Sequence, residues 1–186
     1  MTANDPTAQE APTARMPRGI PYIIGNEAAE RFSWYGMQSI LAIYMSQHLL
    51  MPEALVTQWV HYFGLAVYVL PIAGAIAADA FVDKYRIILW WSIVYCFGHL
   101  ALAVFDGAAG LACGLVLLAI GAGGIKPCVS ANVGDQFDQH NEHLLERVFS
   151  YCYFPVNVGS FLATIAIPWT LNAWGPHTAF GIPGIS

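Results

Sequence analysis

The 186-residue chain has little charge and few basic residues. Asp, Glu, Lys and Arg make up 10% of it and hydrophobic residues 57%, whereas soluble globular proteins carry roughly 25% charged residues. The 7 Lys and Arg are fewer than the 12 Asp and Glu and are scattered along the chain, which excludes a basic surface for nucleic acid. These shortages are typical of an integral membrane protein whose partner is the lipid bilayer.

Several short motifs are also missing. The 4 cysteines show no CxxC spacing, so we expect neither a disulfide framework nor a zinc site. HExxH and GxSxG are absent, which disfavours a membrane enzyme, and GxxxxGK[ST] is absent, which excludes a phosphate loop at 121–126. We expect no cofactor and no metal. Residues 1–19 lack an apolar run, so they are interpreted as a disordered cytoplasmic tail rather than a signal peptide.

Long apolar segments dominate the rest of the chain. Because about 20 apolar residues cross a bilayer, hydropathy predicts five membrane-spanning helices at 20–50, 56–80, 87–105, 110–133 and 148–169. The connections at 51–55 and 106–109 hold no Lys or Arg. By the positive-inside rule, the opposite side is the cytoplasm and holds the N-terminus. Five spans then place residues 174–186 outside. The basic residues on the predicted cytoplasmic side are Arg15, Arg18, Lys84, Arg86 and Arg147.

The first predicted helix carries a polar stripe. Glu27, Glu30, Arg31, Tyr35 and Gln38 are spaced by three and four residues or their sums, so they share one face. Glu27 and Arg31 stand at i,i+4 in the favourable order and can pair, which leaves Glu30 available to titrate. Charged groups within a membrane span are costly and usually face a partner or water. This face is therefore a candidate functional surface, with a static ion pair between helices as the structural alternative.

Three other predicted helices also carry polar groups. In the second, His61 and Tyr68 are seven residues apart and so share a face, with Asp79 again in register. In the fourth, Lys126 follows a glycine-rich run that permits close helix packing, and Pro127 loosens the backbone beside it. The fifth presents a seam of Ser150, Tyr153, Asn157, Ser160 and Thr164, which fits either hydrogen bonding between helices or ligand contact.

Polar faces on four helices predict a water-accessible central cavity. Its mixed carboxylate, imidazole and ammonium groups suit proton relay and ligand binding in a carrier better than they suit a channel.

Three motifs resemble those of the proton-coupled oligopeptide transporter family of the major facilitator superfamily. The segment from Glu27 to Gly36 is similar to the family's ExxER signature, and Gly123 to Phe137 and Phe149 to Ser160 are similar to two further hallmarks. A fourth segment resembles the superfamily's cytoplasmic loop motif, with Gly74, Asp79, Lys84 and Arg86 at its positions. The resemblance covers residues 20–186.

The resemblance implies symport of protons with di- and tripeptides across the cell membrane by alternating access. It assigns proton coupling to Glu27, Glu30, Arg31, His61 and Lys126. It assigns the peptide site to Arg31, Trp34, Tyr35, Tyr68, Lys126 and Asn157. Trp34, Gln38 and Asp83 depart from the usual family residues, and Trp34 is expected to replace a peptide hydrogen bond by stacking.

The implied fold is all-α, with two bundles of six helices in the whole transporter. The chain is expected to supply a partial N-terminal bundle at 20–186, with about five helices and only the start of a sixth. It would then need the C-terminal bundle as a partner and would not transport by itself. The alternatives are a proton-coupled carrier for nitrate or amino acids, or a non-transporting sensor or assembly module.

The predicted topology can be tested by cysteine labelling. A cysteine placed near residue 140 should react with an impermeant reagent only from the cytoplasmic side, and one at Ala108 only from outside. Labelling of both positions from the same side would rule out the five-span topology.

Overall fold

The computed structural model describes residues 17, 19–80, 84–134, 137 and 144–185, and this part of the chain is helical without a strand. The elements are α1 (Ile20–Ile43), the π-helix η1 (Tyr44–His48), α2 (Glu53–Ala80), α3 (Lys84–Val104), α4 (Gly107–Gly134), α5 (Leu145–Trp174) and α6 (Pro176–Ile185). The prediction of an all-α membrane protein is confirmed, and the predicted spans correspond to α1 with η1 and to α2, α3, α4 and α5.

Four of these helices are long and apolar enough to cross a membrane: Glu53–Ile76, Arg86–Val104, Gly107–Val129 and Val148–Trp174. A helix suits this environment because it satisfies its backbone hydrogen bonds internally. α1 is not among these four helices, and it carries three charged residues within five positions. Short turns join α3 to α4 and α5 to α6, where Gly107 and Gly175 adopt φ values of +82° and +83° that side chains other than glycine rarely reach.

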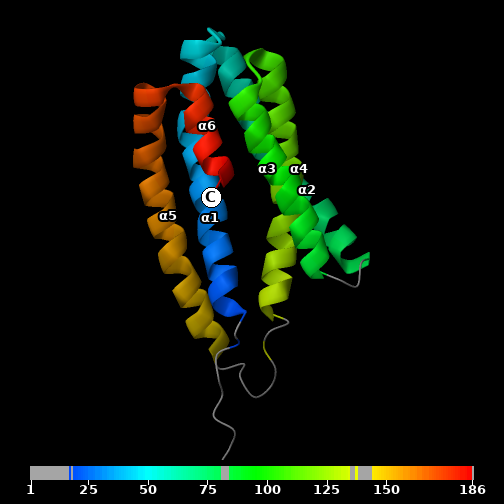
Figure 1. Cartoon of the computed structure of the whole chain (residues 1–186). Helices are drawn as coiled ribbons and strands as arrows, with labels where there is room; N and C mark the ends of the chain where they lie inside the picture. The colour runs from blue at the N-terminus through cyan, green and yellow to red at the C-terminus, as the bar shows by residue number, and fades with distance from the viewer. Residues whose placement is uncertain (1–16, 18, 81–83, 135–136, 138–143, 186) are drawn as a thin grey trace, which may run out of the picture.

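The helices form two groups that α6 connects (Figure 1). α1 packs along α5, whereas α4 packs along both α3 and α2. α6 contacts α3, α5 and α1, so it joins the two groups near the end that also holds η1. The buried core follows these contacts, with Met37 and Ile40 from α1, Leu118 from α4 and Phe180 from α6 completely covered. Large apolar side chains such as Trp90 and Phe161 point outward instead, as expected in lipid.

The sequence predicts the start of a sixth helix near the end of the chain, and the structure has a helix there at Pro176–Ile185. This segment forms α6 and turns back along the bundle after Gly175, which puts Ala179 and Phe180 at zero exposure. Ser33 of α1 donates a hydrogen bond to the carbonyl of Pro183, and His177 Nδ1 lies 2.6 Å from the carbonyl oxygen of Ala103. Its ten residues are too few to span a membrane.

The glycine-rich run of α4 brings three helices very close together. A Cβ on Gly121 would lie 2.8 Å from Cβ of Tyr95 on α3, and one on Gly123 would lie 2.6 Å from Cβ of Leu70 on α2. A Cβ on Gly74 of α2 would collide with the carbonyl oxygen of Gly123. The predicted role of these glycines in close helix packing is therefore confirmed.

Pro127 explains why the carbonyl of Gly123 is available for this contact. A proline inside a helix has no N–H to donate to the carbonyl four residues earlier, and its ring pushes that carbonyl aside. Pro127 lies inside α4, and the carbonyl four residues earlier is that of Gly123. The crossing of α2 and α4 thus lies one turn before Lys126.

Two glycines of α2 provide a matched test of this packing. Gly64→Ala should be neutral or slightly stabilising, because nothing lies within 4 Å of the added methyl group and alanine favours a helix over glycine by about 1 kcal/mol. Gly74→Ala should destabilise the protein by about 1–3 kcal/mol, because the methyl group meets backbone atoms that cannot rotate away. Thermal unfolding in detergent measures both effects, and equal melting temperatures would contradict the close crossing.

Candidate functional site

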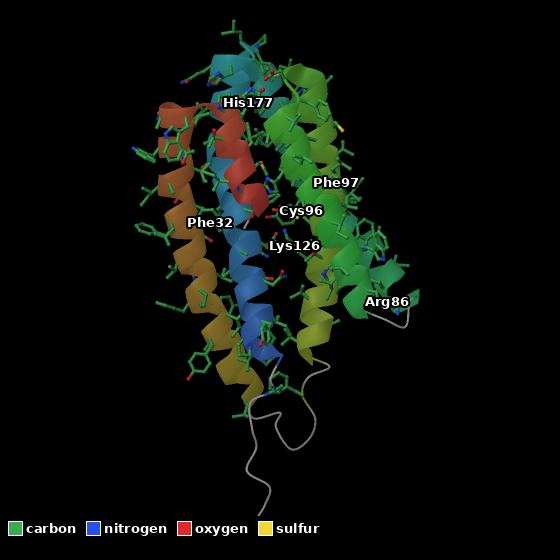
Figure 2. The ribbon with its side chains drawn as sticks, in the orientation of Figure 1. Phe32, Arg86, Cys96, Phe97, Lys126 and His177 are labelled. Atoms are coloured by element: carbon green, nitrogen blue, oxygen red, sulfur yellow. The ribbon has the colours of Figure 1, made fainter. Side chains whose placement is uncertain are left out.

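A pocket of about 470 Å³ opens between α1, α4 and α5. The α1 wall consists of Ile23, Glu27, Arg31 and Tyr35, each four residues after the last, so one stripe of the helix faces the pocket. Lys126 and Val129 of α4 form the second wall, and four residues of α5 form the third: Phe149, Tyr153, Val156 and Asn157. Figure 2 shows Lys126 between α1 and α4, about halfway along the bundle.

Arg31 binds both carboxylates of the ExxER segment. Its Nε and Nη2 each lie 3.0 Å from Oε1 of Glu27, which is the predicted i,i+4 pair. Its Nε also lies 3.2 Å from Oε2 of Glu30. Glu30 thus shares Arg31 with Glu27, and its expected availability to titrate stays a hypothesis.

Glu30 lies behind the pocket rather than in its wall. It is 8% exposed, and neither of its oxygens has a hydrogen bond of normal geometry to another described residue. Its contact with Arg31 is thus an ion pair without hydrogen-bond alignment, although burial makes an unpaired carboxylate costly. Protonation of a carboxylate held in this way would remove a negative charge from a buried ion pair and change the electrostatic balance around Arg31.

Lys126 is attracted by Glu30 and Glu27 and repelled by Arg31. Among the described residues, however, its ammonium group is not within ion-pair distance of a carboxylate. It lies over the indole of Trp34, with Nζ 5.0 Å from the ring centroid. Trp34 is not part of the pocket wall, so its expected stacking on a ligand stays a hypothesis.

Three side chains of the α5 seam form hydrogen bonds within that helix. Asn157 Nδ2 donates to the carbonyl of Tyr153 at 2.8 Å, and the hydroxyls of Ser160 and Thr164 donate to carbonyls one turn earlier. For these three side chains the structure gives bonds within α5 and not between helices, which was one of the two alternatives for the seam. Asn157 and Tyr153 face the pocket.

The predicted residues of α2 are not brought into this pocket. His61 is exposed and Tyr68 is 82% exposed, on a face of α2 that also carries Leu65 and Ile72. Their common face agrees with their spacing, but the described helices leave it uncovered. The side chains of Asp79 and Lys84 lie outside the described ones, and Arg86 is exposed near the start of α3 (Figure 2).

Sequence reasoning missed several residues of the site. Ile23 continues the α1 stripe by one turn, so extending the spacing of four would have found it. Phe149 and Val156 extend the α5 seam in the same way, but they are apolar and do not stand out in a pattern of polar residues. Phe63, which stacks on Trp34, gave no sequence signal because it lies on another helix.

The sequence profile of the POT family matches residues 85–186, which is more than half of the chain. This chain belongs to the POT family. The family assignment agrees with the resemblance found in its motifs, which the profile and the relatives extend over most of the chain.

Individual relatives carry peptide transporter names. The chain is 40% identical to the Drosophila melanogaster protein named peptide transporter family 1, an alignment that covers 96% of this chain and 26% of the relative. It is 38% identical to solute carrier family 15 member 1 of Oryctolagus cuniculus, with 91% and 28% covered. The chain thus spans about a quarter of the length of the curated relatives it matches.

Solved structures of POT family members share its fold. The crystal structure of the POT family transporter PepTSo superimposes with a TM-score of 0.87 at 47% identity, covering 92% of this chain and 35% of that one. A peptide transporter POT in complex with sulfate gives 0.87 at 30% identity, with 92% and 37% covered. These relatives are named as transporters rather than enzymes, and with the membrane-length helices they indicate a multi-pass membrane protein.

Proposed function

We propose that this chain forms part of a symporter that moves di- and tripeptides together with protons across the cell membrane. The observation that carries the proposal is the charged pocket. Arg31, Lys126 and Glu27 line a cavity between helices that are otherwise apolar. The peptide transporter names of the relatives support the same substrate class.

The pocket chemistry suits a dipolar ligand. The cations Arg31 and Lys126 attract a carboxylate, while Glu27 and the side-chain oxygen of Asn157 accept hydrogen bonds from an amine or amide. Tyr35 adds a hydroxyl and an aromatic surface to the same wall. Tyr68 keeps its proposed contact with the peptide, whereas Trp34, which does not line the pocket, is proposed to act on the peptide through Lys126 rather than by stacking on it.

Proton coupling is proposed to work through the network around Arg31. While Glu30 is ionised, it competes with Glu27 and with a bound carboxylate for the two cations. A proton on Glu30 removes one negative charge from a buried network and releases part of Arg31 for the ligand. His61 is proposed as a second proton site on the uncovered face of α2.

The remaining assignments complete the proposal. Gly74, Asp79, Lys84 and Arg86 act as the loop motif on the cytoplasmic side, where the N-terminus also lies. The rest of the site and the moving partner are proposed to come from a second helical bundle of the same transporter, as in the major facilitator fold.

Uptake of a labelled dipeptide by the full-length gene product in proteoliposomes tests this function. An inward proton gradient should drive accumulation, and collapse of the gradient with a protonophore should abolish it. Excess nitrate or single amino acids should not compete. Competition by either would favour the alternative carrier, whereas the absence of any dipeptide uptake would favour a non-transporting module.

Coupling can be separated from binding with two substitutions. Glu30→Gln should reduce proton-driven accumulation at least tenfold while leaving peptide counterflow largely intact, because the amide cannot exchange a proton. Lys126→Ala should impair both, because it removes a cation of the pocket. Normal accumulation by Glu30→Gln would show that the ExxER segment is only structural.

His61 can be tested by its effect on the pH profile. The imidazole group ordinarily titrates near neutral pH, whereas glutamine hydrogen bonds without exchanging a proton. His61→Gln should therefore flatten the dependence of uptake on pH while preserving expression and peptide binding. His61→Ala is less informative because it also removes a hydrogen-bonding group. An unchanged pH profile in His61→Gln would leave Glu27 and Glu30 as the proton carriers of this bundle.

A further inference from the structure

Trp34 connects three helices behind the pocket. It belongs to α1 and stacks on Phe63 of α2, with ring centroids 5.3 Å apart and an angle of 26° between the planes. On α4, the Lys126 ammonium lies 5.0 Å from the indole centroid. Lys126 lines the pocket, whereas Trp34 and Phe63 do not. The two rings thus form a support behind the cation rather than a ligand surface.

The two rings stabilise a charge that has lost its water. An ammonium group inside an apolar bundle needs compensation for its lost hydration. A carboxylate would supply it but would occupy the N–H donors and cancel the charge. The face of an indole attracts a cation through its quadrupole, more strongly than tyrosine or phenylalanine does, and leaves the N–H donors unused.

The surroundings of Lys126 fit this arrangement. Glu30 and Glu27 attract it at longer range and Arg31 repels it, yet in the described part of the chain it forms no ion pair. Both carboxylates are instead engaged with Arg31. Arg31 thus holds both carboxylates at ion-pair distance, and the Lys126 ammonium keeps its N–H donors available to a ligand.

We propose that Trp34 is a positioning residue that holds the Lys126 ammonium charged and directed into the pocket, so that the pocket selects ligands carrying a carboxylate. Phe63 fixes the plane of the indole and thereby the height of the cation above it. This inference rests on the proposed function, because it assigns the basis of ligand selection to the same pocket.

The test compares two ligands that differ only at the group in question. Binding of dialanine and of dialanine amide to the full-length gene product is measured by calorimetry in detergent. Wild-type protein should prefer dialanine. Trp34→Leu should weaken dialanine binding about three- to thirtyfold, the range that cation–π contacts span from exposed to desolvated sites, and should change amide binding less than twofold. The dialanine affinity of Trp34→Phe should lie between those of the wild-type protein and Trp34→Leu.

A double-mutant cycle assigns the effect to the pair. In a Lys126→Gln background, Trp34→Leu should cause no further loss for dialanine, because the group that it positions is gone. Trp90→Leu is the matched control, since Trp90 is 68% exposed on α3 and away from the pocket. It should leave the preference for dialanine unchanged.

Fluorinated tryptophan at position 34 keeps the shape of the ring and weakens its negative face. Dialanine affinity should fall with each added fluorine while amide affinity stays constant, which makes the test independent of whether Trp34→Leu folds. Equal losses for both ligands, or no dependence on fluorination, would overturn the positioning role. If wild-type protein binds dialanine preferentially but Trp34 variants match it, only this inference fails; if wild-type protein binds neither ligand, the proposed function fails as well.

Discussion

The cost of charge inside an apolar bundle constrains the whole site. Glu27, Glu30 and Arg31 fall within one and a half turns of α1, between neighbouring helices that are almost entirely apolar. Arg31 offsets this cost by reaching both carboxylates at 3.0 and 3.2 Å. A planar guanidinium can serve two acceptors at once, which a lysine in its place could not do with the same geometry. The network therefore exists as a unit, and a change of charge at any member changes the balance at the others.

The packing of α4 determines where the Lys126 ammonium lies relative to this network. Small residues at 121–124 let α4 touch α2 and α3 at backbone distance, and Lys126 follows immediately. With bulkier residues in this run, α4 would be displaced outward and the ammonium group would move away from Trp34 and from the pocket. Van der Waals packing of glycine thus has an electrostatic effect, because it sets the separation between charges in a medium of low polarity.

Local patterns in the sequence predicted the features that lie within one helix. The membrane helices, the Glu27–Arg31 pair and the common face of His61 and Tyr68 all follow from hydropathy and from the period of the helix. Contacts between helices were harder to foresee. The stack of Phe63 on Trp34 under Lys126 joins α1, α2 and α4 with no shared spacing. The exact partner of Glu30 also depends on a rotamer choice of Arg31. The sequence predicts the start of a sixth helix but not how α6 packs, because ten residues gain stability only from the helices they contact, α1, α3 and α5.

Pro127 divides α4 into two segments that can bend relative to each other. The segment before it is fixed by the glycine contacts with α2 and α3, whereas the segment after it carries Val129 of the pocket wall. One hydrogen bond fewer joins the two, so bending α4 at this joint requires less energy than bending it elsewhere. Lys126 lies between the glycine contacts and Pro127, within the turn that lacks this hydrogen bond. Bending of α4 at Pro127 should therefore move the Val129 wall of the pocket more than it moves the Lys126 ammonium.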